Sequence, residues 1–414
     1  MNGYNNNFLI RDIIYQISQY LNRNDLINLL SICKTTKQYD NIFFSKYEIN
    51  WFIIMGKRTY AEQCIQMSPK ILQFTKKIKK IKNVIDCQYL IHFPTIESIC
   101  FNDTFNYPLI NIPNTVTSIS FGSRRSCASH FDKPLDNFPP ALRELYLGHM
   151  FDCKVDNLPT TLTKLNFGWY FNQNVDNLGN SLLEIEFGSD FNRKVNSLPQ
   201  SLTKLAFGAS FSQKLNNLPE NLVDLSLGYF YNLPIDKLPN KLLRFELRDH
   251  FNQNIDYLPN TLTRLTLAYR FNRELKKLPT NLLRLKLGAS FESTLDNLPN
   301  TLTKLKIGYM FNQKVDKLPT SLLKLKFGYE FNQKVNNLPS CLTSLSFGYS
   351  FNQTIDNLPD SIVELELSSN YKQRIERIPK NLKCLKVWNC HQLDFDSGKV
   401  KLRYIKDKSL YVVD

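Results

Sequence analysis

FNQKVDKLPTSLLKLKFGYE, Phe311–Glu330, is followed by FNQKVNNLPSCLTSLSFGYS, Phe331–Ser350. Nearly the same sequence therefore recurs after twenty residues. Aligned on the first aromatic residue, thirteen such repeats follow one another without an insertion. They start at Phe131, Phe151, Phe171, Phe191, Phe211, Tyr231, Phe251, Phe271, Phe291, Phe311, Phe331, Phe351 and Tyr371. An earlier repeat starts at Phe105 and carries six extra residues. A period this regular predicts a solenoid of stacked coils.

Six apolar positions recur in each repeat. In the repeat that starts at Phe311 they are Phe311, Val315, Leu318, Leu322, Leu325 and Phe327. Six apolar side chains are too few to offset the conformational entropy lost by twenty ordered residues. A single repeat therefore cannot fold alone, and neighbouring repeats are expected to share their apolar faces.

The second half of each repeat has the alternation of a strand. Side chains of a strand point alternately to its two faces, so Leu325 and Phe327 are expected to point inward. Lys324 and Lys326 would then point outward. The sequence predicts a β-rich solenoid with stacked, short, parallel strands.

Turn residues occupy fixed places between the strands. Pro319 cannot donate to a ladder and is expected on the returning side, while Gly328 suits the turn that leaves the strand. Asp316 and Asn336 are expected to cap the turn before Leu-Pro. A stack of buried asparagines at the second position is expected to bond backbone groups of neighbouring coils. These are Asn172, Asn192, Asn232, Asn252, Asn272, Asn312, Asn332 and Asn352.

The pattern L-x-x-L-x-(F/L) at this period resembles the leucine-rich repeat. The longer pattern F-N-x-x-(V/I)-D-x-L-P resembles the FNIP repeat, a relative of the leucine-rich repeat that is abundant in amoebae and in large DNA viruses that infect them. The proline is replaced at Gly179 and the acidic residue at Lys276. Ser212, Glu292 and Lys372 replace the asparagine. The resemblance implies a leucine-rich-repeat-like solenoid, expected over residues 91–390.

The amino-terminal segment follows a helical period instead. Its apolar residues are Ile13, Ile14, Ile17, Tyr20 and Leu21, then Leu26, Leu29, Leu30 and Cys33. This spacing predicts two or three short helices. The order I-x-x-Y-L-x-x-x-D-L-x-x-L-x-x-I-C-K resembles the F-box, and its matching residues are Ile17, Tyr20, Leu21, Asp25, Leu26, Leu29, Ile32, Cys33 and Lys34. The family's Leu-Pro is Leu9-Ile10 here, and Thr36 stands near its usual Trp.

The F-box resemblance implies docking on the Skp-type adaptor of a cullin-RING ubiquitin ligase. The docking residues it implies are Ile17, Tyr20, Leu21, Leu26, Leu29 and Ile32. The alternative is a helical cap that shields the apolar face of the first repeat, and the two roles are compatible. We expect a small α-helical F-box-like module at 1–50, a connector and N-terminal cap at 51–90, the solenoid at 91–390 and a C-terminal cap or tail at 391–414.

The connector contains the basic run TKKIKKIKNVI, Thr75–Ile85. Three interpretations stay open for Lys76–Lys82: a basic amphipathic element, a nuclear import signal, or an edge-strand cap with a solvated lysine face. The cap is favoured.

Composition bounds the class of protein. Of 414 residues, 43% are apolar, which predicts a folded chain, and 52 Lys and Arg against 37 Asp and Glu give a net charge of +15, which favours acidic partners. The start, MNGYNNN, lacks the apolar run of a secretory signal, and no stretch of eighteen apolar residues follows. We therefore expect no membrane association and an intracellular, cytoplasmic location, the host cytoplasm for a viral protein, with the nucleus left open. The nine cysteines contain no CxxC pair and are expected to be free thiols.

The sequence contains few residues in patterns typical of catalytic sites. It lacks the HExxH, GxSxG, GxGxxG and P-loop patterns. Cys384, Cys390 and His391 are close in sequence, but three such residues are a weak zinc signal and are interpreted as part of a C-terminal cap. We expect a non-catalytic protein without a cofactor or a metal.

The outward strand positions carry the information that differs between repeats. One position is cationic in five consecutive repeats, at Arg244, Arg264, Arg284, Lys304 and Lys324, and its neighbour adds Lys286, Lys306 and Lys326. Strands about 4.8 Å apart would gather these into one basic face. Just beyond the glycine, Tyr269, Tyr309 and Tyr329 would lie beside it. This face is predicted to bind a target, and the alternative is a solvated lysine surface with tyrosines that cover turns.

Two functions remain open. The leading one is a substrate adaptor that docks on a Skp-type adaptor and cullin and holds an unknown, acidic protein target on the solenoid. The alternative is a stand-alone scaffold that binds an acidic protein or nucleic acid through its basic face. Nucleic acid is the less favoured ligand because no nucleic-acid module is recognised.

Overall fold

The computed structural model describes residues 48–50, 79–87, 90–122, 129–368, 370–387, 402–405 and 410–413. The chain divides into two compact parts, Met1–Gly188 and Ser189–Asp414. The described residues of each part form a solenoid of short, mainly parallel strands, as the period predicted. Apart from Glu48–Asn50, the segment predicted to be an F-box-like module lies outside the described residues, as do all six predicted docking residues.

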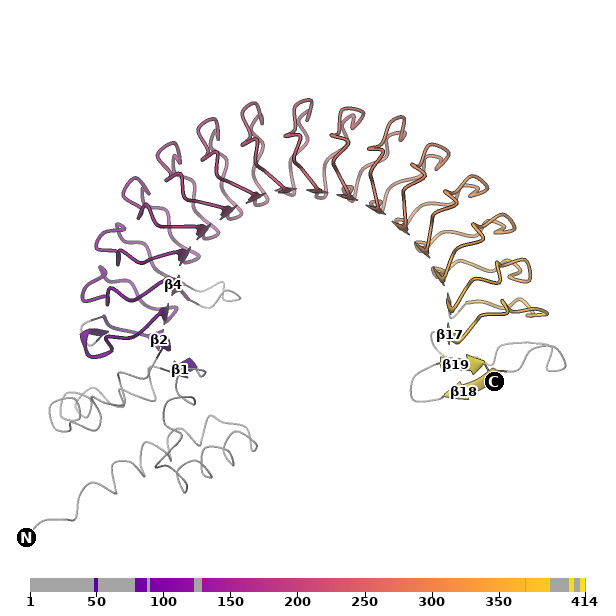
Figure 1. The fold of residues 1–414 in the computed structure, drawn as a ribbon, viewed down its shortest axis with the longest axis horizontal. Coiled ribbons are helices and arrows are strands. Elements are labelled where there is room, and N and C mark those ends of the chain that lie inside the picture. Colours follow the sequence, from indigo (N-terminus) through magenta and orange to yellow (C-terminus); the bar gives the residue numbers. More distant parts are fainter. Residues whose placement is uncertain are drawn as a thin grey trace, which may run out of the picture. The chain divides into compact units, whose positions relative to one another are not determined.

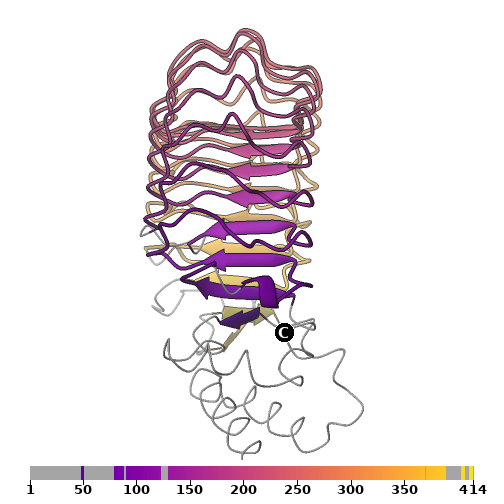
Figure 2. The same ribbon diagram turned by 90° about the vertical axis from the view of Figure 1, so that its left-hand side faces the viewer.

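The described N-terminal part contains these elements: β1 (Glu48–Asn50), β2 (Lys80–Val84), the single-turn 3-10 helix η1 (Leu90–His92), β3 (Ser98–Phe101), β4 (Ser118–Phe121), β5 (Glu144–Tyr146), β6 (Lys164–Asn166) and β7 (Glu184–Glu186). Successive strands from β1 to β7 pair in parallel. Figure 2 shows these strands as indigo and purple arrows stacked one above another. The end of the basic run is therefore strand β2, with Lys80 and Lys82 exposed and Ile81 and Val84 buried.

The C-terminal part continues the same pattern within itself. Its strands are β8 (Lys204–Ala206), β9 (Asp224–Leu227), β10 (Arg244–Leu247), β11 (Arg264–Thr266), β12 (Arg284–Lys286), β13 (Lys304–Lys306), β14 (Lys324–Lys326), β15 (Ser344–Ser346), β16 (Glu364–Leu367), β17 (Cys384–Val387), β18 (Leu402–Ile405) and β19 (Leu410–Val413). Successive strands from β8 to β17 pair in parallel. At the end, β19 pairs antiparallel with β17 and β18 (Figure 1).

The predicted apolar positions form the core. In the repeat that starts at Phe311 all six apolar side chains are buried, and Phe311 and Leu322 are fully so. Equivalent phenylalanines stack in a continuous ladder, with ring centroids 6.2 Å apart both from Phe291 to Phe311 and from Phe311 to Phe331. The core of each coil is therefore completed by the coils on either side of it.

The turns also hold adjacent coils close together. The N–H of Leu322 donates to the carbonyl oxygen of Pro319 at 3.1 Å, which closes the predicted turn. Gly179 keeps the equivalent bond at 3.3 Å without the proline. Glycine is required at position 328 for a reason other than the expected turn. A Cβ at Gly328 would lie 1.6 Å from the carbonyl oxygen of Gly308. Glycine permits close approach of successive backbones at this position.

Asparagines at the second position form an inter-coil ladder. The side-chain oxygen of Asn312 accepts from the N–H of Asn332 at 2.9 Å, and Asn332 accepts from Asn352 in the same way. The expected stack is confirmed, but its members are half-buried or exposed rather than buried. Asp316 accepts at 3.1 Å from the side chain of Asn337, which directly precedes Leu338-Pro339 in the next coil.

The asparagine ladder predicts how two substitutions change stability. No hydrogen bond joins the side chain of Glu292 to the N–H of Asn312, so Glu292→Asn should restore an acceptor. We expect the free energy of unfolding to rise by about 1 kcal/mol, and Asn332→Ala to lower it by about the same amount. Denaturant unfolding measures both. Glu330→Asn, away from the ladder, is the control, and an equal rise in that variant would contradict the explanation.

Candidate functional site

Eight cations form two rows on the outward face of the sheet in the C-terminal part. The first row contains Arg244, Arg264, Arg284, Lys304 and Lys324, and the second contains Lys286, Lys306 and Lys326. We call the two rows the cation array. Strand pairing places each cation directly beside the next one in its row. The sequence prediction brought together the same residues, because an in-register parallel sheet makes equivalent positions neighbours.

Among the described residues, carboxylates form ion pairs with the array only at its two ends. At one end, Arg244 forms an ion pair of 3.6 Å with Asp224 on β9. At the other, Lys326 forms an ion pair of 3.6 Å with Glu366, two strands away on β16. Within the described part of the chain, the six cations between these ends form no ion pair: Arg264, Arg284, Lys304, Lys324, Lys286 and Lys306. The centre of the array is therefore uncompensated.

The positive charges in the array repel one another. The pKa of Lys304 is lowered from its ordinary value chiefly by the charge of Arg284, with partial burial and the charges of Lys324 and Arg264 adding to it. The pKa of Lys306 is lowered first by partial burial and then by Lys286 and Lys326. Each charged lysine is thus less favourable in the folded chain than in the unfolded one. This cost is present below the lowered pKa and disappears as pH rises toward the ordinary value of 10.5.

A row of exposed tyrosines runs beside the array. The rings of Tyr309, Tyr329 and Tyr349 are stacked, with centroids 4.6 and 4.8 Å apart and planes within 10° of parallel. Tyr269 belongs to the same row but is set apart, because Ala289 takes the place of a ring between Tyr269 and Tyr309. Tyr349, which was not among the predicted site residues, extends the row.

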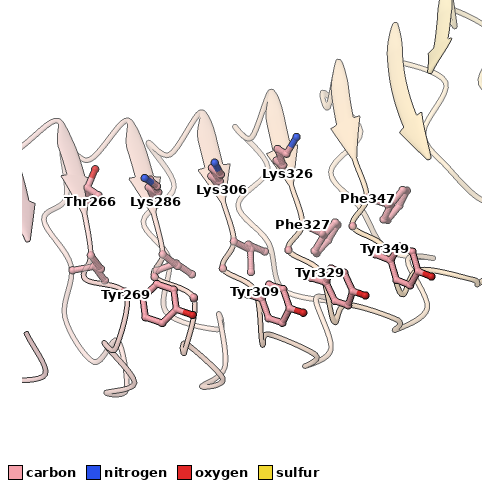
Figure 3. A pocket seen from close by; sticks show the side chains of 18 of the residues that line it. Thr266, Tyr269, Lys286, Lys306, Tyr309, Lys326, Phe327, Tyr329, Phe347 and Tyr349 are labelled. Carbon is pink, nitrogen blue, oxygen red and sulfur yellow. The ribbon is translucent and has the colours of Figure 1, made fainter. Parts of the chain in front are cut away.

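A groove lies between the second row of cations and the tyrosines (Figure 3). Its volume is about 680 Å³, and it crosses the ends of successive strands. Gly288, Gly308, Gly328 and Gly348 line it between the two walls. Sequence reasoning assigned these glycines to turns and missed the groove, although their lack of a side chain at a fixed place in consecutive repeats is the signal for it. A second hollow, of about 490 Å³, lies between the two cation rows.

Other chemistry is sparse in the described residues. They contain no group of three or more His, Cys, Asp or Glu side chains that could hold a metal ion, and Cys390 and His391 lie outside them. Cys87, Cys100, Cys153, Cys341 and Cys384 are free thiols. Within the same residues, no helix has the length and apolar character needed to cross a membrane.

Comparison with protein families finds one match. The family described as FNIP Repeat matches residues 153–190, 171–210, 191–230, 271–310, 311–350 and 334–370. These stretches lie in both parts of the chain and include the repeats that start at Phe311 and Phe331. No curated protein sequence matches this chain.

Several solved structures are similar to this chain to different degrees. CroV588, described as a novel circular LRR protein structure, is 31% identical with a TM-score of 0.66 over 82% of this chain, and this chain spans 61% of CroV588. TLR13, from a complex with ssRNA13, is 16% identical with a TM-score of 0.50, covering 75% of this chain and 54% of TLR13. YopM from Yersinia enterocolitica WA-314 is 20% identical with a TM-score of 0.43, covering 77% of this chain and 82% of YopM. The chain carries FNIP repeats in the matched stretches, on a solenoid of the leucine-rich-repeat type.

Proposed function

We propose that the chain is a recognition scaffold that binds an acidic protein partner on its cation array. The observation that carries the proposal is the row of adjacent cations whose only carboxylate partners in the described structure lie at its ends. A fold gains no stability from like charges placed side by side on neighbouring strands. An acidic partner would offset their repulsion and favour their charged form.

Two features of the surroundings support a protein partner. The stacked tyrosines offer rigid contact area at a low cost in side-chain entropy, as aromatic residues at protein interfaces do. The groove gives the surface relief that a specific interface needs. An arrangement of cations alone would serve any polyanion, and nucleic acid is the competing ligand.

The cation array predicts a charge-dependent affinity for a polyanionic peptide. The full chain should bind fluorescein-labelled polyglutamate, and charge reversal at Arg284, Lys304 or Lys324 should weaken binding by about tenfold or more. Fluorescence anisotropy over a series of salt concentrations measures both effects. Lys334→Glu is the matched control, because Lys334 is exposed, lies outside the strands and changes the net charge equally.

Two outcomes would contradict an acidic protein partner. One is equal weakening by Lys334→Glu, which would mean that only the net charge matters. The other is tighter binding of a single-stranded oligonucleotide than of polyglutamate at the same salt, with a steep salt dependence that the reversals at Arg284, Lys304 and Lys324 remove.

The finer proposal is that the scaffold is a substrate adaptor of a cullin-RING ubiquitin ligase. It rests on the F-box-like order of residues that precedes the repeats, from Ile17 to Lys34. In this role the amino-terminal segment binds a Skp-type adaptor, and the solenoid holds the target near the ubiquitin-charged enzyme. The chain then acts inside the cell, where that machinery is found.

The adaptor role predicts a loss of co-purification on specific substitution. Tagged wild-type chain should recover the Skp-type adaptor and cullin from cells, and Leu21→Asp or Leu29→Asp should abolish the recovery, because a charge would be buried in an apolar contact. Immunoblotting of the eluate measures this. Both variants should still bind polyglutamate, which shows that the repeats remain folded. Failure of the wild-type chain to recover either protein would contradict the adaptor role and leave the scaffold proposal standing.

A further inference from the structure

The tyrosine row has one place without a ring. Ala289 stands between Tyr269 and Tyr309, at the position that Tyr329 and Tyr349 occupy in later repeats. The backbone keeps its register there. The N–H of Ser290 donates to the carbonyl oxygen of Tyr269, and the N–H of Met310 donates to the carbonyl oxygen of Ala289, both at 2.8 Å. Only the side chain is missing. We call this place the Ala289 gap.

The Ala289 gap has the width of one aromatic ring. Consecutive rings elsewhere in the row are 4.6 and 4.8 Å apart. With one ring omitted, twice the strand spacing puts the rings of Tyr269 and Tyr309 roughly 9.5 Å apart. A ring inserted midway would lie within the 4.5–7 Å range typical of aromatic pairs on both of its faces. Tyr269 is 60% exposed and Tyr309 is 47% exposed, so both side chains are accessible to an inserted ring.

The groove beside the gap has two chemically different walls. Lys286, Lys306 and Lys326 line one wall, and tyrosines line the other (Figure 3). Side chains of an extended peptide alternate between its two sides. A peptide that lies along the groove would therefore present one set of side chains to the lysines and the other set to the tyrosines.

The length of the groove bounds the length of this peptide. Its central region crosses the five coils that carry β11 to β15, or roughly 19 Å at about 4.8 Å per strand. An extended chain covers that distance with about six residues. Glu246 and Glu366 line the groove toward its ends and disfavour carboxylates beyond this segment.

We propose that the groove binds an extended segment of about six residues, in which acidic side chains face the lysine wall and an aromatic side chain fills the Ala289 gap. This inference rests on the proposed function, because it names the part of the acidic partner that the cation array recognises. The carboxylates supply charge complementarity to Lys286 and Lys306, and the aromatic residue supplies the specificity that charge alone lacks.

Two peptides test the inference on the full chain. Glu-Ala-Glu-Phe-Glu-Ala places carboxylates on one side and a single phenyl ring on the other, and Glu-Ala-Glu-Ala-Glu-Ala lacks the ring. We expect the phenylalanine peptide to bind about tenfold more tightly, measured by displacement of labelled polyglutamate. Ala289→Tyr should remove this difference by filling the gap from within. Ala209→Tyr is the control, because Ala209 holds the same position in a repeat outside the groove, and it should keep the difference.

The possible results separate the inference from the proposed function. Equal affinity for the two peptides, or a preference that survives Ala289→Tyr, overturns the inference. The inference is also overturned if polyglutamate binds through the array but neither peptide displaces it. In all of these cases the scaffold proposal stands. If polyglutamate itself does not bind at low salt, the scaffold proposal and the inference fall together.

Discussion

Every coil of this protein depends on contact between equivalent residues of successive coils. Phe311 is buried with the rings of Phe291 and Phe331 stacked on either side of it. The backbone N–H groups of Asn332 and Asn352 donate to asparagine side chains of the preceding coil. Gly328 and Gly308 approach so closely that a side chain would collide with a carbonyl oxygen. Since none of these contacts exists within a single repeat, stability belongs to the stack.

The same register determines what the surface can be. Residues that are twenty positions apart become direct neighbours, so an outward position that repeats its charge produces a row of like charges. The inward positions, such as Leu325 and Phe327, must repeat for the coils to stack, whereas Lys324 and Lys326 are free to vary. Their uniformity over several coils costs the fold electrostatic free energy. That cost is the physical reason to interpret the cation array as a binding surface.

Periodicity alone predicted most of the architecture, because the apolar positions, the strand and the returning proline all follow from local rules. It also placed Arg264 beside Arg284 and Lys306 beside Lys326. The features that it did not predict depend on how far a long side chain extends across the sheet and on positions where a side chain is small or missing. The ion pair of Lys326 with Glu366 skips a strand, and the groove exists because glycines lie between two rows of larger residues. The Ala289 gap has meaning only once the neighbouring tyrosines are known to stack.

We infer that the six cations without an ion pair in the described residues serve a partner and do not stabilise the fold. Thermal denaturation tests this inference in a variant in which all six are replaced by glutamine, which keeps part of each apolar stem. These are Arg264, Arg284, Lys304, Lys324, Lys286 and Lys306. We expect a melting temperature equal to or above that of the unsubstituted chain, since like-charge repulsion is removed. A clearly lower melting temperature would show instead that the cations stabilise the solenoid.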